Sequence, residues 1–122
     1  MLHRVKFVFA LLFIIGCSSP PPVLEDFDNE IWKADKHGCK GDRKVMEAAV
    51  MEQRDKLLGF EEMQLVDFLG KPDQNELSKR NEKFYYYYID PAPNCSENGN
   101  SEAKRLSIRF NAMGLSKEIL IE

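Results

Sequence analysis

The amino-acid sequence predicts an α+β fold with two layers, in which N-terminal helices pack on a three-stranded antiparallel β-meander. Apolar residues recur at helical spacing between residues 29 and 69, which predicts amphipathic helices. From Lys83 onward the spacing changes to the alternation that is typical of strands. Because the helices come first and the strands follow, we expect the helices to cover one face of the sheet.

Three helices are expected, over residues 29–36, 43–58 and 61–69. Asp28 and Asp42 are suitable N-caps for the first two helices, since a carboxylate accepts hydrogen bonds from the free backbone amides of a first turn. Gly59 ends the second helix, and Gly70 followed by Pro72 ends the third. The third helix also carries acidic residues in its first turn, where the helix dipole favours them.

Three strands are expected, over residues 84–89, 106–110 and 115–121, with a glycine turn between the last two. Adjacent side chains of a strand point to opposite faces, so the aromatic run divides into two sets. We expect Phe84, Tyr86 and Tyr88 to pack under the helices, because a phenylalanine ring has no hydroxyl group to satisfy. Tyr85 and Tyr87 are then expected to face outward.

The register between the first two strands decides which tyrosines are structural. Leu106, Ile108 and Phe110 define the core-facing side of the second strand. The tyrosines that pair with these residues belong to the core, because paired residues share one face of the sheet. A register shift of one residue would exchange the two sets of tyrosines.

The outward-facing tyrosines, Tyr85 and Tyr87, form a candidate interaction surface with Arg105 and Arg109 of the second strand. Tyrosine offers a large contact area at low entropic cost together with a hydroxyl group, which suits protein interfaces and also sugar stacking. The alternative interpretation is structural. Tyrosine is favoured on half-exposed strands, and both arginines can cover it by cation–π contact.

The N-terminus has the pattern of a bacterial lipoprotein signal. Arg4 and Lys6 precede nine apolar residues, 7–15, and the small residue Gly16 then stands before Cys17. The alternative is a transmembrane anchor, but a helix that spans a bilayer needs about 20 apolar residues. The pattern therefore predicts that cleavage leaves Cys17 as the mature N-terminus and that this residue carries lipid.

This prediction divides the chain into three parts. We expect a signal peptide over residues 1–16, the lipidated cysteine and a proline-rich tether over 17–26, and one α+β domain over 27–122. Two or three acyl chains give stable membrane anchoring, since each buried methylene contributes about 0.8 kcal/mol. Because Ser18 is not a residue that retains lipoproteins in the inner membrane, we expect the outer membrane, facing the periplasm.

Cys39 and Cys95 remain once Cys17 carries lipid, and an even pair in an oxidising compartment predicts a disulfide. The long loop that it closes gives a stabilisation of roughly 4 kcal/mol in the chain-entropy model. The alternatives are two unpaired thiols, a Cys–His nucleophile that uses His37, and a zinc site that uses all three residues. Their spacing matches no zinc finger or ribbon, and neighbours in sequence need not face one another.

The sequence predicts no catalytic site, no metal site and no cofactor. His37 is the single histidine left after His3 is lost with the signal. The glycines punctuate helices rather than forming a phosphate-binding loop, and the Glu61-Glu62 pair is explained as a solvated helix start. A net charge of −3 without a Lys/Arg cluster argues against nucleic acid as a partner.

The order of motifs in the second half of the chain resembles that of a known family. Residues 57–73 read Leu-Leu-Gly-Phe-Glu-Glu-Met-Gln-Leu-Val-Asp-Phe-Leu-Gly-Lys-Pro-Asp, the aromatic strand follows at 84–88, and residues 106–115 read Leu-Ser-Ile-Arg-Phe-Asn-Ala-Met-Gly-Leu. In this order the chain is similar to the SmpA/OmlA family of small outer-membrane lipoproteins, also called BamE-like. The resemblance covers residues 57–121.

The resemblance implies a domain without catalysis, held in the periplasm at the inner leaflet of the outer membrane. The best-known member of the family is an accessory subunit of the complex that folds β-barrel proteins into that membrane. We therefore expect a protein-binding accessory or scaffold in outer-membrane assembly or envelope maintenance, with envelope proteins as partners. The alternative is a periplasmic binding module for a saccharide or other small ligand, such as peptidoglycan, that uses the tyrosines.

Overall fold

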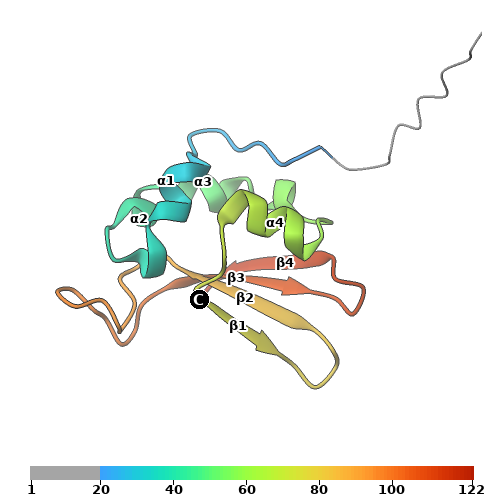
Figure 1. The fold of residues 1–122 in the computed structure, drawn as a ribbon. Helices are drawn as coiled ribbons and strands as arrows, with labels where there is room; N and C mark the ends of the chain where they lie inside the picture. Colours follow the sequence, from blue (N-terminus) through green and yellow to red (C-terminus); the bar gives the residue numbers. More distant parts are fainter. Residues whose placement is uncertain (1–19) are drawn as a thin grey trace, which may run out of the picture.

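The computed structural model describes residues 20–122, which form a helical layer on one face of an antiparallel sheet (Figure 1). The expected signal peptide and Cys17 lie outside these residues. The helical layer contains α1 (Asn29–Ala34), the 3-10 turn η1 (Lys36–Gly38), α2 (Asp42–Val45), α3 (Glu47–Glu52), the 3-10 turn η2 (Arg54–Leu57) and α4 (Glu62–Leu69). The sheet contains β1 (Gln74–Leu77), β2 (Lys83–Tyr88), β3 (Arg105–Phe110) and β4 (Ser116–Ile121).

The α+β class is confirmed, but the prediction of three strands is wrong. The sheet has four strands in the order β1-β2-β3-β4, and every neighbouring pair is antiparallel. The additional strand β1 reads Gln-Asn-Glu-Leu, and all of its residues are exposed. It has no alternation of apolar and polar residues because it is a short edge strand that pairs only with β2 among the described residues.

The long helix expected over residues 43–58 is divided into α2, α3 and η2. The breaks fall at Met46 and Gln53, whose ψ angles of 1° and 14° lie outside the helical range. Each of these residues uses its side chain to hold another segment. The Met46 sulfur accepts a hydrogen bond from the backbone of Asp28, and the Gln53 amide bonds both the N–H and the carbonyl of Glu25.

The core lies between the helices and the inner face of the sheet. Its fully buried large side chains include Trp32, Leu57, Leu65, Leu69, Tyr87, Leu106, Ile108 and Phe110. Leu24 also belongs to this cluster, so packing against the domain begins upstream of residue 27, the expected start of the folded part. Within residues 20–122, no helix combines the length and the apolar character needed to span a bilayer.

The assignment of the two tyrosine faces is wrong. Tyr85 pairs with Ile108 and Tyr87 with Leu106, so these two tyrosines share the inner face with the core residues of β3. Tyr87 is fully buried, and its hydroxyl group donates a hydrogen bond to the Gly70 carbonyl oxygen at 2.8 Å. The set with Phe84 was expected inside because a phenylalanine ring has no hydroxyl group that needs a partner. The core instead provides a hydrogen-bond acceptor for the Tyr87 hydroxyl group, so a tyrosine can be buried there. Phe84, Tyr86 and Tyr88 lie on the other face.

Candidate interaction surface

The face of the sheet opposite the helices carries aromatic, charged and aliphatic side chains, and each of the four strands contributes to it. In Figure 1 all the labelled helices lie on one side of the sheet, and no helix of residues 20–122 covers the other side. We define the outer sheet face by residues that the strand register places together: Glu76 of β1, Phe84 and Tyr86 of β2, Arg105 and Arg109 of β3, and Leu120 of β4. Of these residue types, arginine, phenylalanine and tyrosine are enriched at protein interfaces.

Tyr86 is the centre of this surface, and its ring is covered by its neighbours. The Arg105 guanidinium carbon lies 3.7 Å from the ring centroid, and the Phe84 ring stacks nearly parallel to it with centroids 6.3 Å apart. The Tyr86 hydroxyl group donates to a Glu76 carboxylate oxygen at 2.9 Å. Burial and this hydrogen bond both raise the pKa of Tyr86, so its hydroxyl group stays protonated. Only 6% of the Tyr86 surface is exposed.

The two arginines of the surface are held in different ways. Arg105 donates a hydrogen bond to the Gln74 side chain at 2.9 Å, in addition to its contact with Tyr86. Arg109 lies between Glu82 and Glu118 and forms longer ion pairs with both, at 3.8 Å. The Arg109 side chain keeps about a third of its surface exposed, so its charge remains available to a partner.

The structure brings together only part of the predicted surface. Arg105 and Arg109 lie on the outer sheet face as expected, whereas Tyr85 and Tyr87 lie on the opposite face of β2. Phe84, Tyr86 and Leu120 were missed as surface residues. The alternation in the sequence separates the two aromatic sets, but a register shifted by one residue exchanges their roles.

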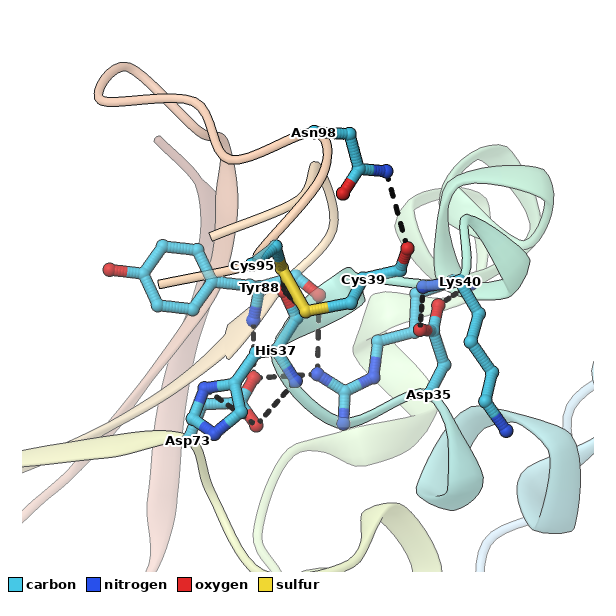
Figure 2. Close-up of a disulfide and its surroundings, with 9 residues drawn as sticks. Asp35, His37, Cys39, Lys40, Asp73, Tyr88, Cys95 and Asn98 are labelled. Atoms are coloured by element: carbon cyan, nitrogen blue, oxygen red, sulfur yellow. Dashed lines mark hydrogen bonds and ion pairs between the residues drawn. A yellow bond between two sulfur atoms is a disulfide. The ribbon is translucent and has the colours of Figure 1, made fainter. Parts of the chain in front are cut away.

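The far end of β2 is covered by a loop that a cysteine pair holds in place. Cys39 and Cys95 form a disulfide, with Cα atoms 5.5 Å apart (Figure 2). The disulfide joins η1 to the loop between β2 and β3, and Cys95 packs with Tyr88 and Ala92. Tyr88 therefore belongs to the outer set by register but is buried under this loop. Sulfurs bonded to each other provide neither a thiolate nucleophile nor a zinc ligand.

A buried ion pair lies beside the disulfide. Arg43 is 1% exposed, and its Nη1 donates to Asp73 at 2.6 Å and to the Tyr88 carbonyl oxygen at 3.2 Å. Asp73 also accepts hydrogen bonds from the backbone N–H groups of Tyr88 and His37, at 2.8 and 3.1 Å. Because every charged group is matched by hydrogen bonds, this pair fixes how the helical layer meets the start of the sheet.

Asp35 completes this polar cluster and explains why α1 ends early. The first helix was expected to continue to residue 36, but it ends at Ala34. The fully buried Asp35 carboxylate instead accepts hydrogen bonds from the backbone of Lys40 at 2.7 Å and of Arg43 at 2.9 Å. These bonds satisfy the amide of Arg43 in the first turn of α2, where no N-cap side chain does so, and the amide of Lys40 in the turn before it.

Comparison with protein-family models, with curated proteins and with solved structures found no match to this chain. The resemblance to BamE-like lipoproteins therefore stays a prediction. Within residues 20–122, no three His, Cys, Asp or Glu side chains are grouped as ligands of a metal ion. The outer sheet face is thus the surface from which we argue a function.

Proposed function

We propose that this protein is a non-enzymatic lipoprotein that binds other proteins of the bacterial cell envelope with its outer sheet face. It acts as an accessory or scaffold in outer-membrane assembly or envelope maintenance, anchored through Cys17 in the outer membrane and facing the periplasm. The observation that carries the proposal is the sheet face without a helical cover, with arginine, aromatic and aliphatic side chains side by side. Arginine and tyrosine are enriched at interface hot spots.

The exposure of Leu120 supports a protein partner. Leu120 is 44% exposed and pairs across the sheet with Ser107, whose small side chain leaves it uncovered. Because Leu120 is already about half buried, a partner that covers the rest of it contributes about 1 kcal/mol, and the neighbouring arginines supply directional contacts.

The saccharide alternative has weaker support. Stacking of a sugar requires an aromatic ring with a free face, but the Tyr86 ring is only 6% exposed, so a sugar would first have to displace Arg105 from it. Tyr85 and Tyr87 face the helices and are not available on this surface. A protein partner does not need an exposed aromatic ring, because it can form contacts with the guanidinium groups of Arg105 and Arg109.

Affinity capture of the full-length chain from detergent-solubilised envelopes tests the proposed function. We expect the wild-type protein to recover envelope proteins, and Leu120→Lys to lose them. Leu77→Lys is the matched control, because Leu77 is 65% exposed on β1 and lies outside the outer sheet face. Equal loss in both variants, or capture of purified cell-wall sacculi in place of proteins, would count against the proposal.

The lipid anchor is tested separately. Cys17→Ala should block processing of the signal peptide and abolish labelling by a palmitate analogue, because the thiol that carries the lipid is removed. The wild-type chain should fractionate with membranes. Unchanged labelling of the variant would show that the lipid is attached elsewhere or that the anchor is a different one.

A further inference from the structure

A groove in the helical layer lies apart from the outer sheet face. It has a volume of about 540 Å³ and runs along α1 and α2. Its lining residues are Asp26, Phe27, Asp28, Ile31, Asp42, Val45 and Met46. Figure 1 shows α1 and α2 on the side of the molecule that faces away from the sheet. A partner in this groove would therefore not compete with one on the outer sheet face.

The aliphatic side chains of the groove have no role in the core. Ile31 is 47% exposed and Val45 is 85% exposed, whereas the adjacent Trp32 is fully buried. In α2 the buried residue is Arg43, which turns Val45 outward. Single exposed apolar residues are common, but here two of them line one hollow beside Phe27 and above the buried Met46.

The rim of the groove is acidic. Asp26, Asp28 and Asp42 line it, and within residues 20–122 none of the three forms an ion pair. Asp28 accepts hydrogen bonds from the backbone of Glu30 and Ile31 at 3.0 and 3.1 Å, which fixes its carboxylate at the start of α1. Its negative charge is therefore held in place without a cationic side chain to neutralise it.

The two basic residues next to the groove in sequence, Arg43 and Lys44, are engaged elsewhere, and Arg43 is buried against Asp73. Lys44 precedes Val45, but its ammonium group pairs with Glu47 at 2.9 Å and with Asp90 at 3.1 Å. These hydrogen bonds raise the pKa of Lys44, so it stays charged and committed to those carboxylates. The groove thus presents exposed aliphatic side chains next to carboxylates that have no ion-pair partner within residues 20–122.

We propose that this groove binds a peptide segment of a protein in which an aliphatic side chain is flanked by lysine or arginine. The aliphatic side chain covers Ile31 and Val45, and the basic residues face Asp26, Asp28 and Asp42. The negative charge beside the exposed aliphatic residues favours a basic peptide over the bilayer surface. A bilayer is flat, and the carboxylates on the rim are repelled by anionic lipid headgroups. The site is additional to the outer sheet face and does not depend on what that face binds.

Methyl NMR of the mature full chain in detergent micelles tests this site. The probes are a synthetic peptide with a leucine between lysines and a control peptide with glutamates in place of the lysines. We expect the lysine peptide to shift the Ile31 and Val45 methyl signals saturably, and the glutamate peptide to bind at least tenfold more weakly. The affinity for the lysine peptide should fall as the salt concentration rises, because part of it comes from charge.

A matched pair of variants locates the binding. Val45→Arg removes an aliphatic group from the groove and adds a positive charge, so we expect at least tenfold weaker binding of the lysine peptide. Met113→Arg makes the same kind of change at a site that is 81% exposed in the turn before β4, and we expect less than a twofold effect.

Three results would overturn the proposal. One is equal weakening in the two variants, and another is equal binding of the two peptides. The third is protection of the Ile31 and Val45 methyl groups by phosphatidylcholine vesicles while neither peptide shifts them, which would assign the groove to the membrane. None of these results depends on the capture experiment with the outer sheet face.

Discussion

Tyr86 and Tyr87 are neighbours in β2, and both are almost inaccessible to solvent, yet different parts of the molecule cover them. Tyr87 packs against Trp32, with ring centroids 6.4 Å apart, and belongs to the core between the two layers. Tyr86 is covered on the opposite face by Arg105, Phe84 and Glu76, which all belong to the sheet itself. A low exposed fraction therefore has two meanings in this protein.

The difference matters because it decides what happens when the covering groups leave. The residues around Tyr87 cannot reach water without separating the layers, so a cavity there remains unfilled. The long side chains around Tyr86 can turn into solvent at little cost. The inner face should thus determine stability, and the outer face should be free to exchange its own contacts for those of a partner.

Truncation of one tyrosine on each face gives the largest expected effect. Tyr87→Ala should lower the free energy of unfolding by about 3–5 kcal/mol, because it leaves a cavity and an unpaired Gly70 carbonyl group. Tyr86→Ala should cost clearly less. Urea denaturation followed by circular dichroism measures both values. A larger loss for Tyr86→Ala would mean that the outer sheet face is the structural one.

Removal of the disulfide tests the loop that covers the Tyr88 end of the outer set. The double variant Cys39→Ser and Cys95→Ser should lose about 4 kcal/mol of stability, because the denatured chain regains the entropy of a loop with a sequence separation of 56. Nitration by tetranitromethane, mapped by mass spectrometry, should rise at Tyr88 and stay unchanged at Tyr87. If Tyr88 remains protected, the loop is held by contacts other than the disulfide.

The sequence predicted the layers of this fold better than its surfaces. The helical and alternating patterns identified which segments form helices and which form β2, β3 and β4, because burial imposes those periods. The polar edge strand β1 carries no such pattern and was missed. The breaks at Met46 and Gln53 were also missed, since they depend on side-chain contacts to segments distant in sequence.

The candidate surface shows the same limit in more detail. The sequence identified Arg105 and Arg109 and the principle that tyrosines paired with Leu106 and Ile108 are structural. It did not identify the register, since both sets contain large aromatic residues and fit either face. The Arg43–Asp73 pair was missed altogether, because nothing local in the sequence indicates that two charged residues so far apart will be buried together.

Alkaline pH separates the two faces by a smaller effect. Burial, and secondarily the neighbouring Tyr85, raise the pKa of Tyr87 well above its usual value of 10.0. The folded state therefore keeps a proton that the unfolded state loses above pH 10, and stability falls by about 1.4 kcal/mol per pH unit from this group alone. Below pH 10 both states are protonated, and the full stability remains.

Tyr87→Phe should weaken this dependence, and Tyr86→Phe should change it less, because the Tyr86 hydroxyl group lies on the surface of the sheet beside Glu76 and not in the core. The measurement is the free energy of unfolding in urea at pH 8 to 11 for the wild-type protein and both variants. Tyr85 also has a raised pKa, from burial and the nearby Glu62 carboxylate, so some alkaline dependence should persist in Tyr87→Phe. Identical slopes in all three proteins would contradict the difference between the faces.

The smallest effect on stability is expected for Arg105→Ala, and it tests the outer face most directly. A cation–π contact near the surface contributes about 0.5–1 kcal/mol, so the variant should fold normally. The Tyr86 ring should nevertheless become accessible, because the guanidinium that lies 3.7 Å from its centroid is gone. Nitration at Tyr86 should therefore rise, while the unfolding transition stays close to that of the wild-type protein.

Arg109→Ala is the matched control, since Arg109 lies on the same strand and face but pairs with Glu82 and Glu118 instead of a ring. We expect no change in nitration at Tyr86 in this variant. Arg105→Ala also separates the two functional hypotheses, because it uncovers an aromatic ring on the outer sheet face. If Arg105 is what prevents a sugar from stacking on Tyr86, purified sacculi should retain Arg105→Ala more strongly than the wild-type protein. If the surface binds envelope proteins, their capture should fall in this variant. Unchanged nitration at Tyr86 would mean that Phe84 and Glu76 suffice to cover the ring, and the surface would then be more rigid than a partner-binding face requires.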